Sequence, residues 1–184
     1  MKQNSPEALP AFDKDVLNAV VETPKGSRNK FKWDTRHELY KLSNVLPNGS
    51  YFPYDFGFVP STEAEDGDPI DVLLFMDEPA FPGCLVPARL LGVILAKQDD
   101  GKRNDRLIAV AGACEVHKDV CSLDDLSKDM LHELEHFFTS YHEARGEEFK
   151  VLGRKGPKHA VCLVKEAEER FREKHRKRTE KGRK

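Results

Sequence analysis

The segment AEDGDPIDVLLFM, residues 64–76, joins a cluster of acidic side chains to an apolar run. Asp66, Asp68 and Asp71 lie within six residues, and residues 69–76 have the composition of a buried β-strand. Carboxylates this close together repel one another unless they share a cation or bind a proton. The segment therefore predicts a strand that begins at a ligand site. A polar turn, in which Asp66 and Asp68 accept hydrogen bonds from local amides, is the alternative interpretation.

The bulk composition predicts one globular domain over residues 1–184. The chain has 39% hydrophobic and 34% charged residues with a formal net charge of -2. A polar lead (1–14) and a basic tail (175–184) are expected to be flexible. The four cysteines form no CxxC pair, and no apolar run is long enough to span a membrane. We therefore expect a cytoplasmic protein with reduced thiols and no membrane partner.

Short strand patterns precede two helical patterns. Strands are expected at residues 15–24, 30–34, 37–46, 69–76, 84–96 and 106–116. The first helix follows Ser127 as its N-cap, and the second covers about residues 158–174. This order predicts an α+β, mainly β fold, in which helices pack on the outside of a small barrel.

Two motifs compete as the chemical centre. The first, His132-Glu133-Leu134-Glu135-His136, matches the HExxH pattern of zinc proteases. At about 100° per residue, however, both histidines fall opposite the apolar face of the predicted helix, where solvent is expected. An exposed polar face is therefore the favoured interpretation of this motif.

The second motif is the acidic segment, whose oxygen ligands suit Mg²⁺. An EF-hand is excluded, because the positions that require Gly and Glu hold Asp71 and Asp77. Phosphate chemistry also needs cations, and loops supply Lys25, Arg28, Lys30, Arg106, Lys150, Arg154 and Lys155. Each of these could also be a solvated surface charge, and no Walker loop is present.

Seven segments in order resemble the soluble family I inorganic pyrophosphatases, from about Val20 to Lys165. They are VVETP, GSRNKF, FPYDFGFVPST, EDGDPIDVLLF, FPGCLVPARLLGV, NDRLIAV and HFFTSY. The resemblance implies a five-stranded, OB-like β-barrel with flanking α-helices. It also implies Mg²⁺-dependent hydrolysis of pyrophosphate with several ions in the site, and a homo-oligomer.

The resemblance implies a role for each matching residue. Asp68 would be the general base, and Glu22, Asp66 and Asp71 would bind metal. Lys30, Arg106 and Tyr141 would contact phosphate, although helical periodicity alone places Tyr141 in the core.

Several positions depart from the family pattern. Phe52 and Phe56 replace tyrosines, Lys32 replaces a common acid, Asn44 replaces an arginine and His142 replaces a lysine. The D-x-K pattern reads Asn104-Asp105-Arg106. Either Asp105 binds metal through a shifted loop or that metal site is weak, and Asp99 and Asp100 are further candidates.

Two alternatives to a pyrophosphatase are also compatible with the sequence. One is hydrolysis of another phosphoanhydride in the same site. The other is a non-catalytic OB-like binding protein, because a fold does not fix a function. Nucleic acid is not expected as a partner, since the aromatic residues sit in apolar surroundings and the central loop is acidic.

Overall fold

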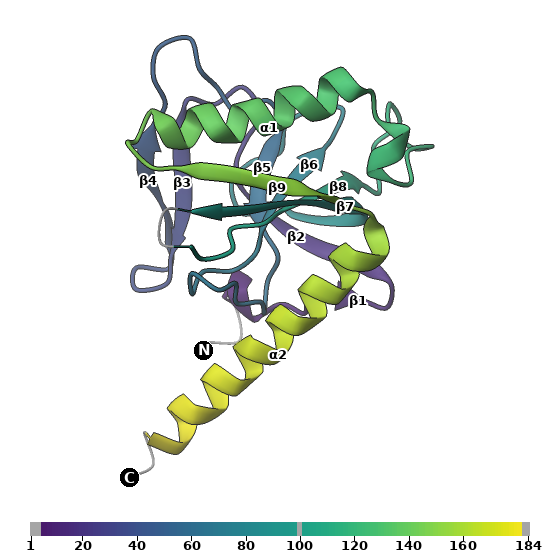
Figure 1. Cartoon of the computed structure of the whole chain (residues 1–184). Helices are drawn as coiled ribbons and strands as arrows, with labels where there is room; N and C mark the ends of the chain where they lie inside the picture. Colours follow the sequence, from purple (N-terminus) through teal and green to yellow (C-terminus); the bar gives the residue numbers. More distant parts are fainter. Residues whose placement is uncertain (1–4, 99–100, 182–184) are drawn as a thin grey trace.

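The computed structural model of the chain describes residues 5–98 and 101–181 (Figure 1). Asp99 and Asp100, two of the candidate metal ligands, lie outside the described residues. Residues 1–4 and 182–184 also lie outside them.

A closed ring of five strands forms the centre of the molecule. In order around the ring, the strands are β2 (Val16–Thr23), β5 (Asp55–Phe58), β6 (Asp71–Phe75), β8 (Arg106–Ala111) and β7 (Leu85–Gln98). Pairing of β2 with β7 closes the ring, and only the β6–β8 pair is parallel among the ring pairings of the described chain. This arrangement confirms the predicted five-stranded, OB-like barrel.

The central ring strands β6 and β8 are buried on both faces. All six residues of β8 are buried, as are four of the five residues of β6. Continuous apolar runs such as VLLF and LIAVA are typical of strands covered on both sides. The first residue of each strand, Asp71 and Arg106, is the point where the buried run meets the polar cleft described below.

Two short strands extend the ring beyond the expected elements. The lead contains the 3₁₀ turn η1 (Pro6–Ala8) and β1 (Phe12–Asp13), which pairs with β2. Strand β9 (Phe149–Lys155) pairs with the second half of β7. The described part of the polar lead therefore belongs to the packed fold.

A separate hairpin, β3 (Asn29–Asp34) and β4 (Leu39–Val45), stands beside the ring. The backbone amide of Phe31 donates to Thr23 Oγ1 at 3.0 Å, which links the hairpin to the end of β2. The hairpin forms one side of the cleft described below.

Helix α1 (Lys128–Glu143) follows the 3₁₀ turn η2 (Leu123–Asp125) and lies along β9 (Figure 1). The Ser127 hydroxyl accepts a hydrogen bond from the amide of Met130 at 3.1 Å, which confirms the predicted N-cap. Leu134 and Phe138 are buried, whereas His132 and His136 are exposed. The two histidines therefore lie on the outer face, as the periodicity predicted.

Helix α2 (Pro157–Lys181) is longer than the predicted 158–174 and packs on β7. Its last turns project beyond the barrel (Figure 1). Arg170 Nε donates to the carbonyl oxygen of Glu63 at 2.8 Å, and Lys174 Nζ lies 2.6 Å from Glu63 Oε2. The helix thus holds the start of the acidic loop (residues 63–71) from outside the cleft. Among the described residues, no helix combines the length and the apolar composition that a membrane span requires.

The sequence prediction of strands differed from the structure in four places. Strands β1, β5 and β9 were not expected, and the strand expected to reach residue 116 ends at Ala111. The backbone turns at Gly112, whose amide donates to the carbonyl oxygen of Pro87.

Gly57 on β5 should tolerate no side chain. A Cβ atom at this position would lie 2.0 Å from the carbonyl oxygen of Val20 on β2. Gly57→Ala must push the two strands apart, and we expect it to lower the free energy of unfolding by about 2–4 kcal/mol in urea denaturation. Gly156→Ala is the control, because no atom within 4 Å would meet its Cβ. Equal midpoints for the two variants would contradict the close approach of β2 and β5.

Candidate active site

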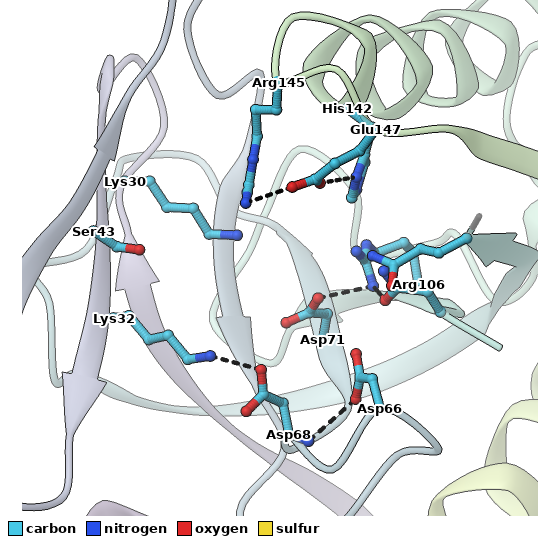
Figure 2. Close-up of a pocket in the computed structure, with 12 residues that line it drawn as sticks. Lys30, Lys32, Ser43, Asp66, Asp68, Asp71, Arg106, His142, Arg145 and Glu147 are labelled. Atoms are coloured by element: carbon cyan, nitrogen blue, oxygen red, sulfur yellow. Dashed lines mark hydrogen bonds and ion pairs between the residues drawn. The ribbon is translucent and has the colours of Figure 1, made fainter. Parts of the chain in front are cut away.

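A cleft of about 420 Å³ opens between the hairpin, the acidic loop and the end of α1 (Figure 2). Its lining is almost entirely polar or charged. The residues are Lys30, Lys32, Ser43, Asp66, Asp68, Asp71, Gln98, Asn104, Arg106, His142, Arg145 and Glu147. The structure thus brings together five of the eight predicted site residues, Lys30, Asp66, Asp68, Asp71 and Arg106.

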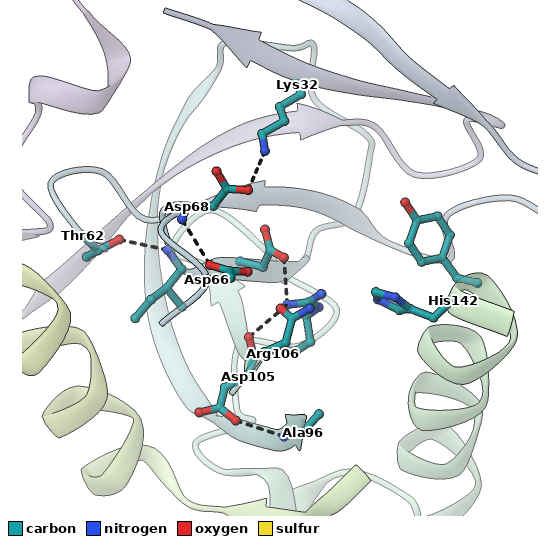
Figure 3. A network of polar contacts seen from close by, with 12 residues as sticks. Lys32, Thr62, Asp66, Asp68, Ala96, Asp105, Arg106 and His142 are labelled. Atoms are coloured by element: carbon teal, nitrogen blue, oxygen red, sulfur yellow. Dashed lines mark hydrogen bonds and ion pairs between the residues drawn. The ribbon is translucent and has the colours of Figure 1, made fainter. Parts of the chain in front are cut away.

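The acidic loop is held in place by hydrogen bonds between its backbone amides and nearby side chains. The Asp68 amide donates to Asp66 Oδ1 at 3.1 Å, which is the local turn that the sequence offered as an alternative. The Thr62 hydroxyl accepts a hydrogen bond from the amide of Ile70 at 3.0 Å (Figure 3). It donates to the carbonyl oxygen of Val59. The turn and the ligand site are therefore compatible, because the loop still directs its carboxylates into the cleft.

Two of the loop carboxylates are paired with basic side chains (Figure 2). Lys32 Nζ lies 2.6 Å from Asp68 Oδ2, and Arg106 Nη1 lies 2.8 Å from Asp71 Oδ2. These pairs offset the repulsion that the sequence predicts among the aspartates.

Glu22 lies in a smaller hollow of about 160 Å³ that adjoins the cleft and shares Lys30, Lys32, Asp68 and Asp71 with it. Its carboxylate accepts a hydrogen bond from the amide of Trp33 at 2.7 Å. Burial of this carboxyl, with a smaller contribution from the negative charge of Asp71, raises the pKa of Glu22 to about 7. A cation in this hollow would therefore be stabilised by Glu22 as well as by the loop.

Arg106 is buried and rigidly placed. Its guanidinium lies 5.5 Å from the ring centre of Phe138 and 5.4 Å from that of Phe149. The same group donates to the side-chain oxygen of Asn104. This packing holds one positive charge at the floor of the cleft.

Asp105 is not brought to the cleft (Figure 3). Its carboxylate makes a bidentate ion pair with Arg103 at 2.8 and 2.9 Å and accepts a hydrogen bond from the amide of Ala96. Alternating side chains at the start of a strand point to opposite sides, so Asn104 and Arg106 face the cleft and Asp105 faces α2. This placement does not support the prediction that Asp105 binds metal.

The opposite wall is basic and aromatic. Lys30 Nζ lies 5.1 Å from the ring centre of Tyr141 and 5.2 Å from that of Phe56. The Tyr141 hydroxyl accepts a hydrogen bond from Arg145 Nη1 at 2.8 Å. Tyr141 lines a hollow beside the cleft, which shares Ser43, Arg145 and Glu147 with it.

Arg145 and Glu147 were not identified from the sequence. Arg145 lies one helical turn after Tyr141, and this spacing is the signal that could have identified it. Glu147 lies beyond the end of α1, and no local pattern marks it.

The departures at Phe52 and Phe56 are accommodated by packing. Both rings are buried, with centres 5.5 Å apart, and Phe52 also contacts Phe137 at 5.3 Å. Asn44 turns its side-chain oxygen to the amide of Val45 and lines the neighbouring hollow. The phosphate side thus has fewer hydroxyl and basic groups than the family pattern implies.

His142 is buried at 3% exposure beside the cleft. Its Nδ1 lies 3.0 Å from Glu147 Oε2, and within the described chain its Nε2 has no hydrogen-bond partner. Burial and the positive charge of Arg106 lower the pKa of His142 to about 4, although Glu147 acts in the opposite direction. His142 is therefore neutral at pH 7.

The carboxylates have the chemistry of a hard-cation site but do not form a closed coordination shell. In the parts of the chain that the structure describes, no three His, Cys, Asp or Glu side chains converge closely enough to hold a metal ion. Asp68 and Asp71 are instead turned to Lys32 and Arg106. The oxygen donors and the raised pKa of Glu22 fit a divalent cation, provided that these pairs rearrange.

Comparisons with known proteins agree with one another. A family model described as inorganic pyrophosphatase matches residues 19–172. The inorganic pyrophosphatase of Halalkalibacterium halodurans is 37% identical over 162 residues, which are 88% of this chain and 99% of that protein. The Synechocystis enzyme of the same name is 35% identical over 165 residues, 89% of this chain and 97% of that protein. The crystal structure of the Thermus thermophilus inorganic pyrophosphatase matches with a TM-score of 0.85 and 32% identity, covering 91% of this chain and 99% of that one.

Folding stability should depend on the protonation of His142. The unfolded chain binds this proton near pH 6.5, whereas the folded protein binds it only near pH 4, so stability is lost as the pH falls between these values. Between pH 7 and pH 4, wild type should lose on the order of 2 kcal/mol more unfolding free energy than His142→Gln. Urea denaturation at both pH values measures this difference. Parallel pH profiles for the two proteins would contradict a buried neutral imidazole.

Proposed function

The chain belongs to the inorganic pyrophosphatase family, and on this premise we propose that its cleft hydrolyses pyrophosphate to two phosphates. The observation that carries the proposal is the opposition of charge across the cleft. Asp66, Asp68 and Asp71 lie on one side, and Lys30 and Arg145 lie on the other (Figure 2). A polyanion with bound cations fits between such walls.

We propose that Glu22, Asp66 and Asp71 hold Mg²⁺, with several ions in the cleft and the hollow beside it, and that Asp68 lies beside these ions as a further negative charge. When bound, Mg²⁺ supplies a water of lowered pKa and positive charge beside the phosphates. Asp105 is left out of this set, because its carboxylate is engaged by Arg103 and Ala96. Asn104 faces the cleft in its place and contributes no charge, so the corresponding metal position is weak.

Asp68 is the proposed general base. It is the most exposed carboxylate of the ion pairs in the cleft, with 59% of its side chain accessible compared with 25% for Asp71. An accessible carboxylate can accept the proton of an attacking water without a change in the barrel. Direct attack by water needs no covalent intermediate on the chain.

Three basic groups are placed to receive the phosphates. Lys30 stands above the rings of Phe56 and Tyr141, and Arg106 is fixed between Phe138 and Phe149. Arg145 is the third of these groups, and its Nη1 donates a hydrogen bond to the Tyr141 hydroxyl. These groups stabilise negative charge on the leaving phosphate.

We further propose that the protein acts in the cytoplasm and that, as the family resemblance implies, it assembles as a homo-oligomer. The free thiols at Cys84, Cys114, Cys121 and Cys162 suit a reducing compartment.

Asp68→Asn should abolish most of the activity. The amide keeps the size of the side chain but accepts no proton, so we expect phosphate release from pyrophosphate with Mg²⁺ to fall by about 100-fold or more. Glu65→Gln is the matched control, since Glu65 lies in the same loop but faces the hollow beside α2. The control should keep its rate within about threefold of wild type.

Three outcomes would contradict this proposal. Retention of the wild-type rate in Asp68→Asn would remove Asp68 from the mechanism. Phosphate release from ATP or tripolyphosphate, but none from pyrophosphate, would favour another phosphoanhydride as substrate. Tight RNA binding without any hydrolysis would favour a non-catalytic binding protein.

A further inference from the structure

We propose that Lys32 competes with divalent cations for Asp68 and thereby sets the cation concentration at which the cleft is loaded. This inference rests on the proposed function, because it concerns the same carboxylates. It assigns a role to a basic residue at a position where the resemblance leads one to expect an acid.

The contact that carries the inference is short and specific. Lys32 Nζ lies 2.6 Å from Asp68 Oδ2, and the side chains are 40% and 59% exposed. Lys32 extends from β3, whereas Asp68 belongs to the acidic loop, so the pair connects two sides of the cleft (Figures 2 and 3). Both the cleft and the hollow around Glu22 are lined by Lys32 and Asp68.

A lysine ammonium is positively charged at neutral pH. Lys32 Nζ lies beside the carboxylate of Asp68, and the hollow that Lys32 lines also contains Glu22 and Asp71. Lys32 therefore places a positive charge among the carboxylates.

An ammonium and a metal ion exclude each other at this position. Asp68 Oδ2 accepts a hydrogen bond at 2.6 Å, and a divalent ion on the same oxygen would be placed directly beside a like charge. The ion binds tightly only after Lys32 moves away. While Lys32 stays in place, the ion is held more weakly. Arg106 makes a similar pair with Asp71, but its guanidinium is buried between aromatic rings and cannot move as freely.

The size of the effect follows from Coulomb's law. In a water-like dielectric, an ammonium about 6 Å from a divalent ion changes its affinity by about tenfold. Replacing Lys32 with a neutral side chain should therefore tighten Mg²⁺ binding by about this factor. The effect should become smaller as the salt concentration rises, because the pair is partly exposed.

The test is calorimetric titration of Mg²⁺ into the full chain without pyrophosphate, for wild type, Lys32→Gln and Lys32→Arg. Lys41→Gln is the matched control. Lys41 is the cross-strand partner of Lys32 in the hairpin, and it pairs with Asp34 at 2.9 Å rather than with a cleft carboxylate. Circular dichroism and thermal unfolding check that each variant is folded.

We expect the Kd for Mg²⁺ to be about tenfold lower in Lys32→Gln than in wild type, and unchanged within about threefold in Lys32→Arg and Lys41→Gln. Binding in Lys32→Gln together with none in wild type would also support the inference. Equal or weaker binding in Lys32→Gln would overturn it, and so would equal tightening in Lys41→Gln.

The inference and the proposed function fail differently. If wild type hydrolyses pyrophosphate but Lys32→Gln binds Mg²⁺ no more tightly, only the role of Lys32 is wrong. If Lys32→Gln binds Mg²⁺ more tightly but no protein releases phosphate, only the proposed reaction is wrong. If no variant binds Mg²⁺, both are wrong.

Discussion

Repulsion among Glu22, Asp66, Asp68 and Asp71 is the constraint on which the arrangement of the cleft depends. Two of these carboxylates are paired with Lys32 and Arg106, and burial raises the pKa of Glu22 toward neutrality. The free protein thus offsets part of the negative charge with its own side chains. The same charge is what a divalent cation would bind, so the stability of the free protein and the affinity for cations oppose each other.

The barrel limits this repulsion, because it fixes the backbone positions of the charged residues. Asp71 and Arg106 begin the parallel neighbours β6 and β8, so their ion pair is set by the register of the sheet. Lys32 comes from a hairpin outside the ring, and its side chain remains partly exposed. The cleft therefore contains one rigidly held positive charge, that of Arg106, and one that can move, that of Lys32.

The strand pattern predicted a small barrel, because buried strands such as β6 and β8 read as continuous apolar runs, and the family resemblance implied its five strands. Strand β5 was missed because it has only four residues and contains Gly57. The absence of a side chain at Gly57 allows β2 to approach closely. The acidic loop and Arg106 were identified by motif, whereas the choice between Asn104 and Asp105 depends on which way a strand residue faces. Glu147 could not be predicted, because its contact with His142 arises from the chain turning back after α1.

The bracing of the acidic loop by α2 has a consequence for the order of folding. Arg170 and the carbonyl group of Glu63 that it binds are 107 residues apart in the chain, so this contact forms only after the ring strands and α1 have been synthesised. A nascent chain that has emerged as far as β9 would have every barrel strand, yet its loop would lack this support. A cleft able to bind ions would then form late in synthesis. Its loop depends on a contact between distant parts of the chain, and such contacts form slowly.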